Sequence, residues 1–420
     1  MPHPPIDGLA YYEIEFNEAG GLINDDGLLN DAESGKFDDI FIMAHGWNTS
    51  AGSAENLYQA MFGLLAAQLP GRVDRCAAVG VIWPALLFPG DDPNTATATA
   101  STGKVLAAAL SPAFPTQTDA LDRMGTLLDT RPQDPDRLTE FHQLAASLVT
   151  SKAGETHEDS GENAAITGDT ATVFGFFSAL AKQPPVGGQG QALANPFSPL
   201  WDGAREVLRT LSYYEMKNRA GVVGETGLGP LLVNLVSDDN TPRARVHLSG
   251  HSFGARLVSF ALRPLPAGPA TPVKSLLLIQ AAFSHFSFAA PLPLDPARNG
   301  ALADRRDRVD GPLLATFSAA DRALGWWYPT ASMLSHQDSQ ARDDLTYRWG
   351  AIGHDGYQQP GVIEHLLLAA KQPYVFVKNH FYRLDANDVI SADQSPVSGA
   401  HSDIRHPEIL WAAISAAGLA

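Results

Sequence analysis

The stretch "RVHLSGHSFGARLVSFALR", residues 245–263, joins two different patterns at one point. The apolar run "ARVHLS" (244–249) predicts a buried strand, and "GARLVSFALR" (254–263) places apolar residues three and four apart, as a helix does. Between them lie Gly250, His251, Ser252, Phe253 and Gly254. A strand, a sharp turn and a helix therefore follow one another around Ser252.

The two glycines have a steric reason. A serine in a tight, strained turn needs neighbours without a Cβ two positions away, because the strand and the helix pack closely there. Its hydroxyl then lies at the helix N-terminus, where main-chain N–H groups favour a developing negative charge. This arrangement is that of a nucleophile elbow, and Ser252 is the candidate nucleophile. The alternative is a structural glycine-rich turn with an incidental serine.

Short apolar runs resembling buried strands recur along the chain. They are "DIFIMA" (39–44), "AAVGVIW" (77–83), "ARVHLS" (244–249), "SLLLIQAA" (275–282), "LLATFS" (313–318) and "PYVFVK" (373–378). A helical pattern over 53–69 lies between the first two runs. Apolar strands that alternate with helices predict an α/β fold with a parallel sheet covered on both faces.

The alternation stops between about Pro84 and Trp201. That region is rich in Ala, Thr, Pro and Gly and contains helical patterns near 136–150 and 170–182. We interpret 85–200 as a mostly helical cap or lid inserted into a core formed by residues 1–84 and 201–420. A poorly ordered surface excursion is the alternative.

Composition excludes several kinds of function. The net charge of −17 disfavours binding to nucleic acid or to anionic membrane surfaces. Cys76 is the only cysteine, so no intrachain disulfide is possible, and a buried apolar role is expected for it.

The segment "GVVGETGLGP" (221–230) lacks the Lys-Ser/Thr of a phosphate loop, and "HED" (157–159) is a weak metal motif, so we predict no cofactor and no metal. No signal peptide or long apolar segment is evident, which favours a cytoplasmic protein without stable membrane association.

The segment "DIFIMAHGWNTS" (39–50) predicts an oxyanion hole beside the serine. A strand runs into His45-Gly46-Trp47, and Ser50 or Ser53 can cap the helix that follows. We expect the main-chain N–H groups of Trp47 and Phe253 to be the two donors. His45 is expected to fix the loop by hydrogen bonding, and the Trp47 indole to form a pocket wall or to pack in the core.

The candidate acid and base follow Ser252 in the chain, as the order in this type of fold requires. Asp321 comes three residues after a strand, in a short loop where a carboxylate can accept an imidazole N–H. His401, in "SGAHSDI", lies in a loop after the last strand and before a C-terminal helix. Weaker alternatives are Asp295, Asp304 and Asp307 for the acid, and His380 and His406 for the base.

Aromatic residues follow two of the predicted strands. Trp326, Trp327 and Tyr328 come soon after Asp321, and Phe283, Phe286 and Phe288 follow the preceding strand. They form either an apolar pocket at the sheet edge or part of the core. The substrate-binding surface is assigned to His45, Gly46, His251, Trp326 and Trp327.

With these motifs the chain resembles the serine hydrolases of the α/β-hydrolase superfamily. "FIMAHGWNTS", "VIWP", "YYEMKNRAGVVGETGLGPLL", "VHLSGHSFGARLV" and "GAHSDI" look like a group of mostly uncharacterised bacterial members of it, over residues 36–84 and 205–420. The His-Gly-X loop is similar to the simple oxyanion loop of lipases and esterases. The insertion is not covered by the resemblance, so no substrate class is carried over.

The resemblance implies an eight-stranded sheet, with Ser252 as nucleophile, His401 as base and Asp321 as acid. The expected reaction is hydrolysis of small carboxylic esters through an acyl-enzyme intermediate. An acyltransferase on the same scaffold and a non-catalytic binding module are the alternatives.

Overall fold

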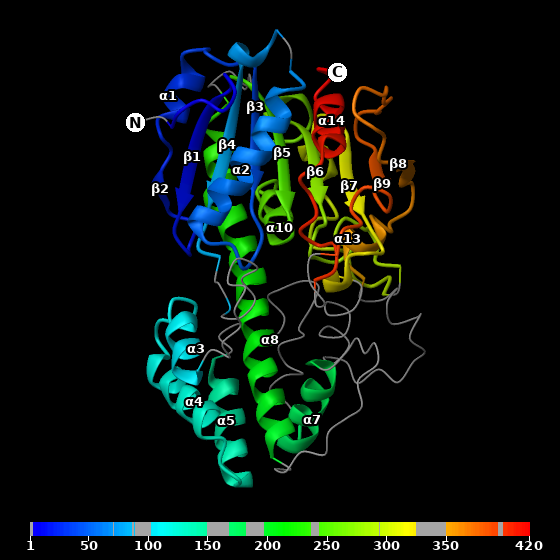
Figure 1. Ribbon diagram of the computed structural model, residues 1–420. Helices are drawn as coiled ribbons and strands as arrows, with labels where there is room; N and C mark the ends of the chain where they lie inside the picture. The colour runs from blue at the N-terminus through cyan, green and yellow to red at the C-terminus, as the bar shows by residue number, and fades with distance from the viewer. Residues whose placement is uncertain are drawn as a thin grey trace.

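A nine-stranded sheet forms the centre of the computed structural model, within the residues that the structure describes (Figure 1). These are 3–69, 71–85, 88, 102–148, 168–181, 197–236, 243–293, 295–324, 350–393 and 398–420. The strand order is β2-β1-β4-β3-β5-β6-β7-β9-β8. Every neighbouring pair is parallel except β1 and β2, which pair antiparallel at one edge. The fold is therefore α/β with a mostly parallel sheet.

The strands are short and largely apolar. They are β1 (Ala10–Phe16), β2 (Leu22–Asn24), β3 (Asp39–Ala44), β4 (Cys76–Ile82), β5 (Arg245–His251), β6 (Val273–Ile279), β7 (Leu313–Phe317), β8 (Ile363–Leu366) and β9 (Phe381–Asp385). All six residues of β3 are buried, since Ile40, Ile42 and Ala44 point to one face of the sheet and Phe41 and Met43 to the other. A strand covered on both sides reads as a continuous apolar run, which is why the sequence pattern located it.

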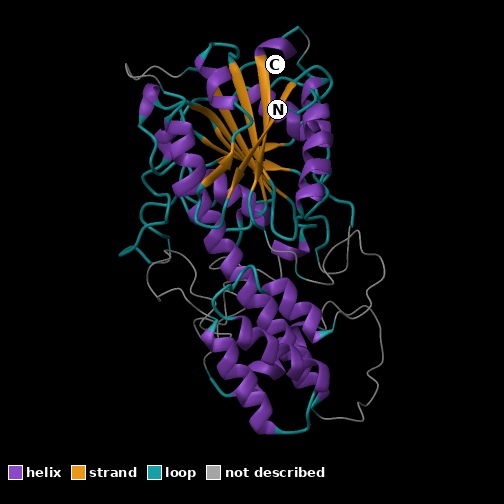
Figure 2. Ribbon diagram, turned by 90° about the vertical axis from the view of Figure 1, so that its left-hand side faces the viewer, coloured by secondary structure: helices purple, strands orange, loops and turns teal. Residues whose placement is uncertain are grey.

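Helices cover both faces of the sheet (Figure 2). One face packs against α2 (Ala51–Ala66) and α14 (Pro407–Ala416). The other packs against α1 (Leu28–Glu33), α8 (Ser198–Val222), α9 (Gly229–Val233) and α10 (Phe253–Phe260). Ser50 is the N-cap of α2, and its side chain accepts a hydrogen bond from the amide of Ser53.

The described part of the predicted insertion is helical. It contains α3 (Gly103–Leu110), α4 (Thr118–Thr130), α5 (Pro135–Ser147) and α7 (Thr170–Ala181), which gather with the N-terminal half of α8 below the sheet in Figure 1. Phe141 packs edge-on against Phe174 and Trp201, with ring centroids 5.8 and 5.9 Å apart. The helix α8 continues from this cluster to the sheet, so the boundary predicted after residue 200 falls inside one unbroken helix.

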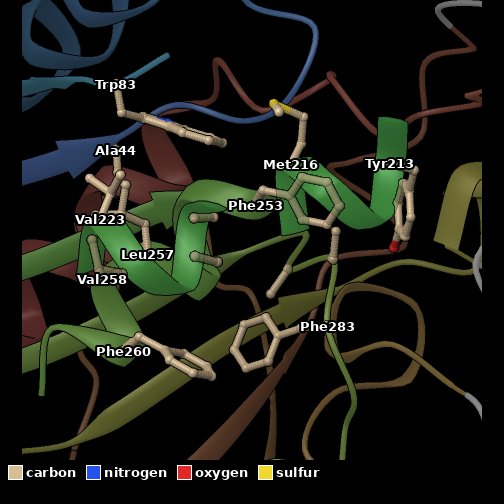
Figure 3. Close-up of a cluster of buried hydrophobic side chains, with 14 of the residues drawn as sticks. Ala44, Trp83, Tyr213, Met216, Val223, Phe253, Leu257, Val258, Phe260 and Phe283 are labelled. Atoms are coloured by element: carbon tan, nitrogen blue, oxygen red, sulfur yellow. The ribbon is translucent and has the colours of Figure 1, made fainter. Parts of the chain in front are cut away.

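A small hydrophobic cluster surrounds α10, the helix that follows Ser252 (Figure 3). Leu257 and Val258 of α10 pack with Val223, the residue after α8, and Phe260 lies beside Phe283. The chain after α8 forms one π-helical turn, Val223–Leu228, in which a Cβ on Gly224 would lie 2.2 Å from the carbonyl oxygen of Leu257. The glycine-rich segment 221–230 thus lets two helices approach closely behind the nucleophile turn.

Two sequence predictions about strands were wrong. The resemblance implied eight strands, and the described sheet has nine. The short edge strand β8 carries three exposed residues out of four, so no apolar run predicted it. The run "PYVFVK" (373–378) is not a strand; the strand β9 begins at Phe381. In that run Tyr374 stacks on Phe376, and Val375 is 82% exposed. Its apolar residues pack locally at the sheet edge, and a period-two pattern cannot distinguish that from strand pairing.

Cys76 is buried at the start of β4, as expected, and burial raises the pKa of its thiol to about 11. None of the helices in the described residues has the length and apolar character that crossing a bilayer requires.

Candidate active site

Ser252 occupies a strained turn between β5 and α10. Its backbone has φ 57° and ψ −121°, a left-handed conformation that non-glycine residues rarely adopt. Its amide donates to the carbonyl of Ile279 (3.1 Å), and its carbonyl accepts from the amide of Ala282 (3.3 Å). The end of β6 therefore holds the turn in place from the side.

Three glycines make room for this turn. A Cβ on Gly250 would lie 2.4 Å from the carbonyl oxygen of Gly254, and one on Gly254 would lie 2.1 Å from that of Ala44. A Cβ on Gly46 would lie 2.7 Å from the Cβ of Ser252. The loop after β3 and the turn after β5 therefore touch directly, and side chains at these positions would force them apart.

Ser252, His401 and Asp321 form one hydrogen-bonded chain. Nε2 of His401 lies 2.9 Å from Oγ of Ser252, and Nδ1 of His401 lies 2.7 Å from Oδ2 of Asp321. A carboxylate only accepts, so Nδ1 carries the proton and Nε2 is left to accept from the serine hydroxyl. Three side chains that are far apart in the sequence are thus brought together in the order that nucleophilic catalysis needs.

The loops that carry Asp321 and His401 are paired with each other. Asp321 is completely buried and forms an isolated β-bridge with Gly399. The amide of Ala400 donates to the carbonyl of Ala320 (3.0 Å), and Oδ1 of Asp321 accepts from the amide of Leu324 (3.0 Å). His401 keeps 13% of its side chain exposed, so His401 reaches the surface while Asp321 does not.

The competing candidates lie elsewhere. His380 directly precedes β9 and is exposed, at the amino end of a parallel strand, whereas Ser252 follows the carboxyl end of β5. His406 pairs with Asp403 at the N-terminus of α14 (2.9 Å). Asp304 and Asp307 are exposed and Asp295 is half-buried, and each lies near an arginine.

The loop after β3 is fixed by hydrogen bonds to its main chain. The amide of His45 donates to the hydroxyl of Tyr58 (3.0 Å), which donates to the carbonyl of Val81 (2.6 Å). Nε1 of Trp83 donates to the carbonyl of His45 (3.0 Å). The ring of His45 is buried against Trp83, donates from Nδ1 to the carbonyl of Gly46, and has its pKa lowered to about 4 by burial.

The predicted oxyanion donors belong to Phe253, which directly follows Ser252, and to Trp47, which directly follows Gly46. Phe253 is the first residue of α10, and within the described residues neither its amide nor that of Trp47 donates a hydrogen bond to the protein. The Trp47 indole is half-buried, with its ring 6.3 Å from that of Phe253 and 5.7 Å from that of Tyr213 of α8. The helix α8, which comes from the helical cluster, thus places an aromatic ring against Trp47 and Phe253.

The remaining predicted binding residues have different surroundings. His251 is buried, and its Nε2 donates to the main-chain carbonyl of His401 (2.9 Å), so it contacts the loop of the base. Burial and the neighbouring His401 lower the pKa of His251 to about 3. Phe283, Phe286 and Phe288 are buried in the core. Trp326, Trp327, Tyr328 and the "HED" segment 157–159 lie outside the described residues.

Sequence reasoning missed two residues. Tyr58 looks like an ordinary apolar helix position, and only its buried hydroxyl links β4 to the loop after β3. Gln280 lies in the apolar run after β6, and its amide donates to Asp321 (3.0 Å). A polar residue inside an apolar strand run is the signal that could have drawn attention to it.

No group of three or more metal-binding side chains with suitable geometry occurs among the described residues. No family model, curated protein or solved structure matches the chain.

Proposed function

We propose that the protein is a serine hydrolase of the α/β-hydrolase type that cleaves carboxylic esters. The observation that carries the proposal is the hydrogen-bonded chain from Ser252 Oγ through His401 to the buried carboxylate of Asp321. The strained backbone of Ser252 at the start of α10 supports it, since such strain is kept where the surrounding structure serves a function. The order of the three residues in the chain also fits this class.

In the proposed reaction Oγ of Ser252 attacks the ester carbonyl carbon while Nε2 of His401 takes the hydroxyl proton. The tetrahedral intermediate then breaks its bond to the alcohol oxygen, which receives the proton from His401, and an acyl-serine ester remains. Asp321 holds the imidazole in the required tautomer and stabilises the imidazolium. Water, deprotonated by His401, attacks the acyl-enzyme, and the acid leaves as Ser252 regains its proton.

The amides of Trp47 and Phe253 would bind the oxyanion of each tetrahedral intermediate. Phe253 directly follows the serine, and Trp47 follows Gly46, which lies against Ser252. Neither N–H group has another acceptor in the described structure. The N-terminus of α10 adds a partial positive charge at the same point. Loss of one oxyanion donor typically raises the activation free energy by about 3–4 kcal/mol.

A fluorophosphonate probe tests the proposal, because it phosphonylates an activated serine. Wild-type protein should be labelled, and Ser252→Ala should not be, with a melting temperature close to wild type. Ser259→Ala is the matched control. Ser259 is buried in α10, the helix that follows Ser252, and its hydroxyl donates to the carbonyl of Ala255 (2.7 Å). Labelling that persists in Ser252→Ala would remove Ser252 from the mechanism.

Substrate class is tested with a panel of nitrophenyl esters of increasing acyl length. The Trp47 and Tyr213 rings, which lie near the ring of Phe253, the residue after Ser252, favour an apolar acyl or aryl group. We therefore expect kcat/KM to rise from the acetyl ester to medium acyl chains. A flat or falling series would argue against an apolar acyl site.

A further inference from the structure

One fully buried amide lies behind the carboxylate of Asp321. We propose that Gln280 is a positioning residue, whose side chain orients Asp321 so that Oδ2 faces Nδ1 of His401. This inference deepens the proposed hydrolase function and rests on it. Gln280 is the residue after β6 and has no exposed surface.

Every hydrogen-bonding group of the amide is used. Nε2 donates to Oδ2 of Asp321 (3.0 Å) and to the carbonyl of Gly353 (2.9 Å). Oε1 accepts from the hydroxyl of Thr316 (3.0 Å), and that hydroxyl accepts in turn from the main-chain amide of Gln280 (3.1 Å). Because the Gly353 carbonyl can only accept, the NH₂ end must face it, and the network itself fixes which end of the amide is which.

These contacts restrain the rotation of the carboxylate. Oδ2 of Asp321 is shared between Nδ1 of His401 and Nε2 of Gln280, and Oδ1 is held by the amide of Leu324. Rotation about the Cβ–Cγ bond of an aspartate is soft, so one hydrogen bond on Oδ1 would leave Oδ2 free to swing away from His401. The second donor on Oδ2 removes that freedom.

The backbone around Gln280 is built for this contact. Gln280 has φ 44°, a left-handed conformation uncommon for a residue with a side chain. A Cβ on Gly353 would lie 2.4 Å from the carbonyl carbon of Gln280, so only glycine lets the 350–355 segment approach the amide. The strained backbone of Gln280 and the need for a glycine at position 353 indicate that the surrounding structure fixes the position of the Gln280 amide.

A neutral donor also suits the chemistry. A lysine at this place would neutralise Asp321 and compete with His401 for its charge, and a glutamate would repel it. An amide donates without adding charge, so the full negative charge of Asp321 stays available to the imidazolium that forms when His401 takes the serine proton.

The test compares Gln280→Met, which keeps the length and loses the hydrogen bonds, with Gln280→Asn, which keeps an amide that is one methylene too short. Gln359→Met is the matched control, because Gln359 is also buried and its amide has no hydrogen-bond partner in the described structure. The first measurement is the downfield proton NMR resonance of His401 Nδ1–H, assigned by its loss in His401→Ala. The second is kcat and KM on a nitrophenyl ester, with melting temperatures recorded for each variant.

We expect the resonance to shift or broaden in both Gln280 variants, and kcat to fall roughly tenfold or more with KM unchanged. The control should match wild type in both. An unchanged resonance in folded Gln280→Asn overturns the inference, even if kcat falls. If Gln280→Met does not fold, the milder Gln280→Asn decides. If wild type hydrolyses no ester, the proposed function fails, while the resonance still decides whether Gln280 orients Asp321.

Discussion

Nε2 of His251 donates a hydrogen bond to the main-chain carbonyl of His401, 2.9 Å away. The residue directly before Ser252 therefore holds the loop that carries the candidate base. A neutral imidazole can donate from Nε2 while Nδ1 stays unprotonated, and the lowered pKa of about 3 means that His251 stays neutral at neutral pH.

This buried neutral histidine makes stability depend on pH. In the unfolded chain the pKa of His251 returns to about 6.5, whereas in the folded protein it is about 3. Below pH 6.5 the unfolded state binds the proton and the folded state does not, so stability is present above that pH and is lost as the pH falls toward 3. His251→Phe should reduce the loss of unfolding free energy between pH 6.5 and 5 by about 2 kcal/mol.

Urea unfolding at a series of pH values checks this expectation. His251→Phe should also be less stable at pH 7 by about 1–3 kcal/mol, because the His401 carbonyl loses its donor. His45, with a pKa lowered to about 4, contributes in the same direction and remains in both proteins. Equal pH slopes in variant and wild type would mean that His251 is not buried in the neutral form.

The positions of two histidines predict opposite kinetic results. His401→Ala should lower kcat on a nitrophenyl ester by about 10³-fold or more, since Ser252 then lacks a base. His380→Ala should leave kcat unchanged, because His380 lies at the amino end of β9, whereas Ser252 follows the carboxyl end of β5. An inactive His380→Ala beside an active His401→Ala would reverse the assignment.

Gly46 has no room for a side chain. Gly46→Ala would place a Cβ 2.7 Å from the Cβ of Ser252, so the loop after β3 or the Ser252 turn must move. We expect kcat to fall on the order of 100-fold, because about 1 Å of misplacement has that effect. Gly52→Ala, in the first turn of α2 with open space around it, should keep full activity and gain about 0.5–1 kcal/mol of stability. Normal turnover by folded Gly46→Ala would contradict the contact.

Tyr58→Phe removes the hydroxyl that links the His45 amide to the Val81 carbonyl. Two buried main-chain groups lose a partner, so unfolding free energy should fall by about 1–3 kcal/mol. Because the His45 amide begins the loop that is proposed to bind the oxyanion, kcat should fall while KM changes little. Differential scanning calorimetry and steady-state kinetics measure the two effects, and a loss of stability with unchanged kcat would limit Tyr58 to a structural role.

A second Ser-His-Asp arrangement lies near the other end of the sheet and should be inert. His247 bonds to Ser275 (2.9 Å) and to Asp39 (2.9 Å), with all three side chains buried in adjacent strands. Burial raises the pKa of Asp39, but hydrogen bonds from His247 and Arg245 outweigh it and lower the pKa overall. Asp39→Asn should cost on the order of 3 kcal/mol of stability, measured by urea unfolding. Mass spectrometry of the fluorophosphonate adduct should find label on Ser252, and label on Ser275 would contradict its burial within a strand.

Local patterns were enough for much of the fold. The boundaries of β3, β4, β6 and β7 follow apolar runs that predicted them within three residues, because strands buried on both faces carry a strong local signal. The same patterns did not predict the exposed edge strand β8, and they wrongly predicted a strand in the aromatic segment before β9. At an edge, pairing depends on neighbours that local periodicity does not represent.

The candidate nucleophile, base and acid could be chosen from the sequence because each follows a strand, and parallel strands bring their carboxyl ends to one edge of the sheet. Glycine spacing around Ser252 carried that signal in a few consecutive residues. Hydrogen bonds between residues far apart in the chain have no such local trace. Only the tertiary structure therefore revealed three contacts, because it brings β4, β6 and three loops together. They are the amide of Gln280 with Asp321, the hydroxyl of Tyr58 with the loop after β3, and His251 with the His401 carbonyl.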